Sequence, residues 1–312
     1  MSIRPYHFIR FEPNGFTGFR RRVEHAGGTV CLDLEDSVDS PDAAERRALK
    51  RRRRHDLVDL LRASGPDAAG LFVRINAAGT ADHARDVAAL ASLSDRPGLF
   101  LPKAERPGDV AALLAALAVP ALVPVVESEA GFAGLAGFRA AGVRAAGGSA
   151  VAEVAFGHCD YNLDRGLFPF AHHDDARYWA WMDRLDAGAR ASGLGVVHSP
   201  VLRLDDLGLF QAVQTRLGRY PSATGQVTLS LAQTQACAAP GPAGARPDPG
   251  PAPPGADAAH EAALEVARQT VQHFRAHRRP DGHFALDGAR TVVSPQEYRA
   301  ACAVLAAHAQ CA

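Results

Sequence analysis

The stretch TVCLDLEDSV, residues 29–38, decides the fold that this chain is expected to adopt. It begins as a short apolar run and ends among three carboxylates, Asp33, Glu35 and Asp36. The apolar part is typical of a buried strand, and the composition of the stretch that follows is typical of a helix. Carboxylates crowded at the end of a strand repel one another and resist desolvation, so their presence needs a physical reason.

Eight apolar runs of this kind are spaced along the chain, separated by longer stretches rich in Ala, Leu and Arg. The runs are YHFIRF, TVCLDL, GLFVRI, GLFLPK, ALVPVV, VAEVAF, GLGVVHSP and GQVTLSL. Their near-continuous hydrophobicity is typical of buried parallel strands. Eight strands alternating with helices predict an α/β fold, a (β/α)8 TIM barrel, with a doubly wound open sheet as the alternative. No G-x-G-x-x-G or Walker A pattern follows any run, which disfavours a nucleotide-binding version of that sheet.

The chain of 312 residues divides into three expected parts. Residues 1–237 hold the eight runs and form the predicted catalytic barrel. Residues 238–258 are so rich in Pro, Gly and Ala that they predict a linker without a packed core. Residues 259–312 hold two helical stretches around the turn-rich DGHFALDG, which predict a C-terminal helical appendage. Ser294 followed by Pro295 is the expected start of the last helix.

Composition excludes several classes of function. The formal net charge is zero, so no global field draws the chain to nucleic acid or to an anionic membrane. Five cysteines without regular spacing argue against a zinc cage or a disulfide framework. We expect a cytoplasmic protein, because the first residues lack a signal peptide and Pro120 and Pro124 interrupt the longest apolar stretch. The basic run KRRRRH, residues 50–55, is interpreted as a solvated helix face.

Polar side chains follow almost every predicted strand. In a barrel the C-terminal ends of the strands meet at one face, which carries the active site. The side chains expected there include Arg10, Asp33, Glu35, Asp36, Arg74, Lys103, Glu127, Asp160 and His198. Acids outnumber bases and the ligand atoms are oxygen, which favours Mg²⁺, or else Mn²⁺, over zinc. Glu127 and Asp160, each closing a strand, are the expected ligands, and the acids of LDLED are expected to bind metal-bound water.

Three other residue types near the predicted site allow more than one interpretation. Arg74 is either a structural ion-pair partner in the barrel mouth or a bidentate clamp on a substrate carboxylate, and the surrounding acids favour the clamp. His198 either reaches the pocket or is a hydrogen-bonded structural residue. Cys31 and Cys159 flank the site without an obvious base, so a thiolate nucleophile is not expected.

The motifs LDLEDSV, VRIN, LPKAE, VVESEAGF and AFGHCDYNLDRG, in this order, resemble the HpcH/HpaI aldolase and citrate lyase β-subunit superfamily. The closer likeness is to the citrate lyase β-like branch, which includes malyl-CoA and citramalyl-CoA lyases. The likeness covers about residues 6–235 and resumes in LEVARQTVQHFRAH and GHFALDG. It implies a Mg²⁺-dependent carbon–carbon lyase built on a TIM barrel and assembled as a homotrimer or hexamer.

The resemblance also implies roles for single residues. Glu127 and Asp160 match the family's metal ligands, and Arg74 matches the residue that holds the carboxylate of an oxo or hydroxy acid. Glu35 and Asp36 match an acidic pair beside the metal-bound waters.

Three further positions complete the expected site. Gly131 falls at a loop glycine that lets the substrate approach the backbone. Lys103 is expected as a pocket wall or an electrostatic partner, and Arg10 as a further substrate contact.

The expected reaction is the cleavage or formation of a carboxylated 3-hydroxyacyl thioester of malyl-CoA or citramalyl-CoA type, through a metal-stabilised enolate. Two alternatives stay open: an aldolase acting on a free 2-oxo acid without CoA, and a non-catalytic subunit that binds a metal and a dicarboxylate. The stretch TVVSP, residues 291–295, lacks the acid of the family's MIDxP motif, which keeps both alternatives in play.

Overall fold

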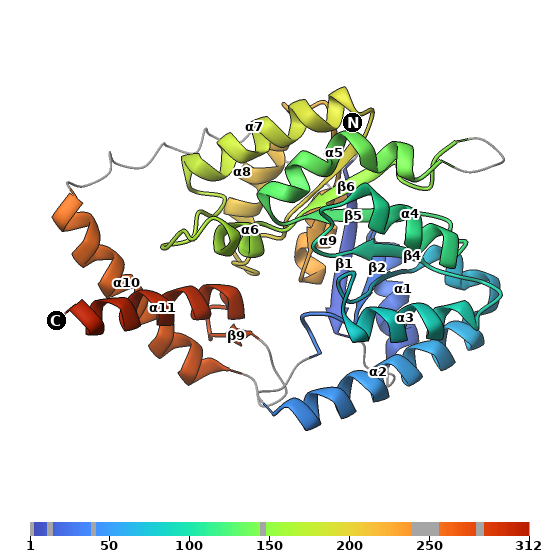
Figure 1. Ribbon diagram of the computed structural model, residues 1–312, viewed down its shortest axis with the longest axis horizontal. Coiled ribbons are helices and arrows are strands. Elements are labelled where there is room, and N and C mark those ends of the chain that lie inside the picture. Colours follow the sequence, from blue (N-terminus) through green and yellow to red (C-terminus); the bar gives the residue numbers. More distant parts are fainter. Residues whose placement is uncertain are drawn as a thin grey trace.

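A closed barrel of eight parallel strands forms the centre of the molecule (Figure 1). The computed structural model describes residues 3–10, 15–38, 42–143, 148–238, 256–278 and 284–311. The barrel strands are β1 (Arg4–Arg10), β2 (Thr29–Asp33), β3 (Phe72–Arg74), β4 (Gly98–Leu101), β5 (Leu122–Val126), β6 (Glu153–Phe156), β7 (Gly195–His198) and β8 (Ala223–Thr228). Each predicted apolar run overlaps one of these strands, although β1 and β8 begin two residues earlier than their runs, so the TIM-barrel prediction is confirmed.

The first strand closes the barrel. Tyr6 of β1 lies opposite Thr29 of β2 on one side and opposite Val227 of β8 on the other, both in parallel register. An open sheet has two unpaired edges, so this double pairing shows that the alternative, a doubly wound sheet, is wrong. Apolar side chains fill the barrel interior, with the rings of Tyr6 and Phe100 packed edge to face at 5.3 Å.

Helices follow the strands and surround the barrel, burying a second and larger apolar core between the two layers. They are α1 (Phe16–His25), α2 (Ala43–Ser64), the 3₁₀ helix η1 (Gly65–Gly70), α3 (Ala81–Ala91), α4 (Pro107–Ala116), α5 (Glu129–Ala141), α6 (His158–Asp164), α7 (Ala176–Ala191), α8 (Leu207–Leu217) and α9 (Leu231–Ala238). None of the helices in the described ranges is long and apolar enough to cross a membrane.

The C-terminal segment consists of α10 (Ala256–His277), β9 (Ala285–Leu286), β10 (Val292–Val293) and α11 (Pro295–Cys311). The two long helices pack against each other beside the barrel (Figure 1). The last helix begins as predicted, because α11 starts at Pro295 and the Ser294 hydroxyl accepts a 3.1 Å hydrogen bond from the Glu297 N–H. The predicted linker, residues 238–258, lies mostly outside the described residues, so the division into three parts stays a prediction.

Backbone hydrogen bonds join the C-terminal segment to the barrel of its own chain. The N–H of Val292 in β10 donates to the carbonyl of Leu202 at 2.9 Å, and the N–H of Leu204 donates to the carbonyl of Arg290 at 3.0 Å. Leu202 and Leu204 belong to the loop that follows β7. The segment therefore covers the face of the barrel at which the strands end.

Candidate active site

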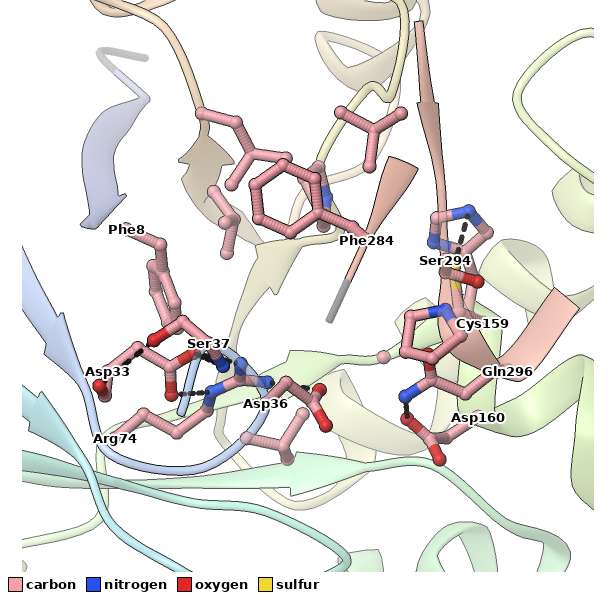
Figure 2. A pocket seen from close by; sticks show the side chains of 18 of the residues that line it. Phe8, Asp33, Asp36, Ser37, Arg74, Cys159, Asp160, Phe284, Ser294 and Gln296 are labelled. Atoms are coloured by element: carbon pink, nitrogen blue, oxygen red, sulfur yellow. Dashed lines mark hydrogen bonds and ion pairs between the residues drawn. The ribbon is translucent and has the colours of Figure 1, made fainter. Parts of the chain in front are cut away.

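A cavity of about 440 Å³ opens where the barrel strands end and the C-terminal segment crosses them (Figure 2). Its polar and charged lining includes Arg10, Asp33, Asp36, Ser37, Arg74, Glu127, His158, Cys159, Asp160, Arg290, Ser294 and Gln296. Its apolar lining includes Phe8, Phe100, Val125, Phe156, Leu204, Val227, Leu229, Phe284, Leu286 and Val292. Most of the charged residues predicted at the strand ends thus line one cavity, as a barrel requires, whereas Glu35, Lys103 and His198 are not among its lining residues.

Arg74 and Asp33 form a bidentate ion pair at one side of the cavity. The two residues lie opposite each other in the register of β3 and β2, which brings their side chains to the same level of the barrel. The Nε of Arg74 donates to Asp33 Oδ1 at 2.8 Å, and its Nη2 donates to Asp33 Oδ2 at 2.6 Å. Burial opposes ionisation of Asp33, but the guanidinium outweighs it and holds the pKa of this carboxyl below its usual range.

The remaining side of the guanidinium faces the acidic pair. The Nη1 of Arg74 donates to Asp36 Oδ2 at 3.1 Å (Figure 2). The same Nη1 lies 3.0 Å from Glu35 Oε2. Part of the reason for the crowded carboxylates is therefore a cation of the protein itself. The structure is compatible with both interpretations of Arg74, the structural ion-pair partner and the substrate clamp, because the side chain pairs with Asp33 and also lines the cavity.

Lys103 connects the acidic pair to the predicted metal ligands. Its Nζ lies 2.8 Å from Glu35 Oε1 and 3.6 Å from Asp160 Oδ1. Burial and the neighbouring Asp36 raise the pKa of Glu35 to about 7, even though Arg74 and Lys103 pull it down. Two cations, Arg74 and Lys103, do not fully offset this buried group of acids.

Glu127 directly follows β5, is buried and lines the cavity. Its Oε2 accepts a 2.7 Å hydrogen bond from the backbone N–H of Lys103, whose φ of 50° lies in the left-handed region. Gly157 leaves room for the carboxylate, because a Cβ there would lie 2.4 Å from Glu127 Oε1. Burial, and then the charge of Asp160, raise the pKa of Glu127 well above its ordinary value.

Asp160 lies in the first turn of α6, just beyond β6. Its Oδ2 accepts a 2.7 Å hydrogen bond from the side-chain amide of Gln296 in α11 (Figure 2). Burial and then the charge of Asp36 raise its pKa above the ordinary value. The second predicted metal ligand is thus held by the C-terminal segment as well as by the barrel.

The two carboxylates fit a magnesium ion. Among the described residues, no group of three or more His, Cys, Asp or Glu side chains could hold a metal as a closed cage. Mg²⁺ does not need one, because it usually takes one or two carboxylates and fills its other positions with water and substrate oxygens. Glu127 and Asp160 supply an oxygen-only pair whose ionisation burial opposes, and a cation would favour the ionised form.

The other predicted site residues have different surroundings. Arg10 lines the cavity at the end of β1, as predicted. Gly131 is buried in α5, where a Cβ would meet the carbonyl of Ala104 at 2.9 Å, and it is not part of the cavity lining. His198 is fully buried, with its Nε2 2.7 Å from the hydroxyl of Tyr178, which supports the structural interpretation.

Cys159 lines the cavity beside Asp160. Burial, and then the charge of Glu297, raise the pKa of its thiol well above the ordinary value. A protonated thiol is a poor nucleophile, which agrees with the expectation that the site does not use a thiolate.

Sequence reasoning missed the contributions of the C-terminal segment, above all Phe284 and Gln296. Both lie in or beside the stretches GHFALDG and TVVSP, the first of which resembles the family whereas the second departs from it, and the resemblance implies no role for either residue. Gln296 is 136 positions from Asp160 in the chain, so periodicity and local spacing carry no signal for their contact.

Solved structures share this fold. RipC from Yersinia pestis is 20% identical over 76% of this chain and 93% of that chain, with a TM-score of 0.56. The citrate lyase β subunit from Mycobacterium tuberculosis, complexed with oxaloacetate and magnesium, is 24% identical over 76% of this chain and 95% of that chain, with a TM-score of 0.55. The CitE protein from Mycobacterium tuberculosis, in complex with magnesium, acetoacetate and coenzyme A, is 23% identical over 98% of this chain and 97% of that chain, with a TM-score of 0.57.

No protein-family model matches the sequence, and no curated protein matches it. The likeness that the motifs predicted is therefore confirmed through structure and at the level of the fold. The chain has the (β/α)8 fold of the citrate lyase β-subunit structures, and in one of them the likeness extends over the C-terminal segment as well.

Proposed function

We propose that this protein is a Mg²⁺-dependent carbon–carbon lyase that cleaves or forms a carboxylated 3-hydroxyacyl thioester of malyl-CoA or citramalyl-CoA type. The observation that carries the proposal is the buried pair Glu127 and Asp160, whose pKa values are raised and which face a cavity also lined by Arg74. Two structures with this fold contain magnesium, one with oxaloacetate and one with acetoacetate and coenzyme A. Those ligands support an oxo acid and a thioester as the chemical classes.

Cleavage of such a thioester requires three changes in bonding. The 3-hydroxyl group loses its proton, the bond between carbons 2 and 3 breaks, and the electron pair moves onto the thioester carbonyl as an enolate. A Mg²⁺ held by Glu127 and Asp160 would supply the positive charge that this chemistry needs. The enolate then takes up a proton at carbon 2, and condensation reverses each change.

Residues of this chain would orient the substrate and balance its charge. Arg74 would hold the carboxylate next to the bond that breaks, in a direction fixed by its ion pair with Asp33. Lys103, between Glu35 and Asp160, would favour the ionised forms of these two carboxyl groups beside the reacting groups. Asp36, which lines the cavity, would accept hydrogen bonds from ordered water or from the hydroxyl group.

A second candidate function is an aldolase that acts on a free 2-oxo acid without CoA. It is supported by Phe284, Leu286 and Val292, which give the C-terminal side of the cavity an apolar wall. Val293 also stands at the place of the MIDxP acid.

The test is product analysis by mass spectrometry. Malyl-CoA and citramalyl-CoA are incubated with the protein, with and without Mg²⁺, beside the variant Glu127→Gln. Release of an oxo acid and a shorter acyl-CoA, dependent on Mg²⁺ and lost in the variant, supports the lyase. Cleavage of free 4-hydroxy-2-oxo acids alone supports the aldolase, and metal-dependent binding without turnover supports the non-catalytic alternative.

The resemblance further supports assembly as a homotrimer or hexamer. Sedimentation velocity at micromolar concentration tests this part of the proposal, and a purely monomeric protein would contradict it.

A further inference from the structure

The cavity has a charged side and an apolar side. Its charged side holds Arg74, Asp36 and Asp160, which the proposed function uses. Its apolar side consists of two walls that the proposed function does not explain, one from the barrel and one from the C-terminal segment. A small oxo acid with one or two carboxylates gives these walls nothing apolar to bind.

The barrel supplies the first wall, which we call the floor. The floor consists of Phe8, Phe100, Val125, Val227 and Leu229, which line the cavity and pack into the apolar cluster inside the barrel. The rings of Phe8 and Phe100 lie 5.0 Å apart, and the Cζ of Arg74 lies 5.5 Å from the centre of the Phe8 ring. The floor therefore begins directly beside the group that is proposed to hold the substrate carboxylate.

The C-terminal segment supplies the second wall, which we call the roof. The roof consists of Phe284, Leu286 and Val292. Val292 pairs with Leu286 between β10 and β9, and its N–H is bonded to the barrel loop at Leu202. Figure 2 shows the ring of Phe284 across the cavity from Asp36 and Asp160. Because the roof is hydrogen-bonded to the barrel, the space between the two walls is built into the fold.

We infer that the 2-oxo acid released or consumed at this site carries an unbranched or aromatic apolar substituent larger than methyl, which packs between the floor and the roof. The inference rests on the proposed function and extends its substrate type, because malyl-CoA and citramalyl-CoA release oxo acids that carry only a hydrogen atom or a methyl group at this position. A cavity of about 440 Å³ is of the size that holds ligands well beyond a three-carbon acid. Burying an apolar chain against the two walls is favourable, whereas burying a second carboxylate there is costly.

The test is a series of straight-chain 2-oxo acids from pyruvate to 2-oxohexanoate, titrated calorimetrically into the full-length protein with Mg²⁺ present. Each methylene that becomes buried is expected to tighten binding roughly fourfold. The whole series then spans roughly 60-fold between pyruvate and 2-oxohexanoate, and phenylpyruvate is expected to bind more tightly than pyruvate.

Variants of the roof test where the substituent binds. Phe284→Ala is expected to lower the ratio of 2-oxohexanoate affinity to pyruvate affinity roughly tenfold. Val292→Phe, which adds bulk to the roof instead of removing it, is expected to lower the same ratio by filling the space. The matched control is Leu305→Ala, in the same segment but packed in the helix pair away from the cavity, which is expected to keep the wild-type ratio.

The outcomes separate this inference from the proposed function. Mg²⁺-dependent binding of pyruvate with no gain along the series overturns the inference and leaves the proposed function standing. A gain that survives unchanged in both Phe284→Ala and Val292→Phe overturns the roof as the binding wall. If no acid in the series binds in a Mg²⁺-dependent way, both the inference and the proposed function are wrong.

Discussion

Gln296, the second residue of α11, donates a 2.7 Å hydrogen bond to the carboxylate of Asp160, which follows the sixth barrel strand. Only 4% of Gln296 is exposed, so the contact is protected from competing water. The C-terminal segment thus fixes the direction of one of the two proposed metal ligands. Groups that orient a ligand in this way typically alter metal affinity 10–100-fold when they are removed.

We expect Gln296→Ala to weaken Mg²⁺ binding by roughly tenfold, because Asp160 loses the donor that orients it. The measurement is the Mg²⁺-dependent rise of the thermal unfolding midpoint, recorded over a range of Mg²⁺ concentrations. Gln269→Ala is the matched control, since Gln269 is exposed on α10 and bonds only to Glu265 among the described residues. Equal Mg²⁺ dependence in the two variants would show that the contact is not used for metal binding.

We expect Gly157→Ala to disturb Glu127 directly. The added methyl group would lie 2.4 Å from Glu127 Oε1 and 2.5 Å from its Cγ, so the carboxylate must move. Loss of the Mg²⁺-dependent stabilisation, by at least roughly tenfold in affinity, is the expected result. Gly108→Ala is the control, because nothing lies within 4 Å of the added methyl group there. Mg²⁺ binding of wild-type strength in Gly157→Ala would exclude Glu127 as a ligand.

The ion pair of Arg74 and Asp33 is expected to contribute strongly to stability as well as to the site. The Asp33 side chain is 5% exposed and that of Arg74 is 15% exposed. Removing Arg74 therefore leaves Asp33 buried without its cation, and removing Asp33 takes away the bidentate partner of a guanidinium that keeps Glu35 and Asp36. Arg74→Ala and Asp33→Ala are each expected to lower the free energy of unfolding by about 3–5 kcal/mol. Urea unfolding of both single variants and of the double variant measures the coupling. Losses that simply add in the double variant would mean that the two side chains act independently.

Glu35 is expected to make stability depend on pH. Its pKa is raised to about 7 in the folded protein, so between about pH 4.5 and pH 7 the folded state binds more protons than the unfolded state. The free energy of unfolding, measured without divalent cations, is therefore expected to fall as the pH rises through this window. Glu35→Gln should reduce that slope, whereas the exposed Glu265→Gln should keep it. A slope that is the same in Glu35→Gln and wild type contradicts the raised pKa.

Much of the fold was predictable because it follows from local pattern. Buried parallel strands are apolar almost throughout, so TVCLDL and its seven counterparts marked all eight barrel strands. The level of Asp33 and Arg74 in the barrel follows from the parallel register of β2 and β3. Their ion pair was harder to predict. The sequence indicates that charged side chains gather at the strand ends, but it does not indicate which cation pairs with which acid.

The part of the site that sequence reasoning could not predict comes from contacts between distant parts of the chain. Phe284 and Gln296 reach the cavity only because β10 bonds to the loop after β7. Neither hydrophobic periodicity nor capping signals in the C-terminal segment specify that docking. Gly131 is the opposite case. The resemblance predicts that the substrate approaches this glycine, but in the structure Gly131 lies in the packed helix α5, where a Cβ would lie 2.9 Å from the carbonyl of Ala104.

The most direct test of the account is a calorimetric titration of pyruvate into wild-type protein and into Glu127→Gln, each with a chelator and then with Mg²⁺. We expect pyruvate to bind the wild-type protein only when Mg²⁺ is present and not to bind the variant, because the acidic strand ends require a cation to accept an oxo acid. Equal affinity with and without Mg²⁺, or unimpaired Mg²⁺-dependent binding in Glu127→Gln, would show that Glu127 does not hold a magnesium ion that binds the oxo acid.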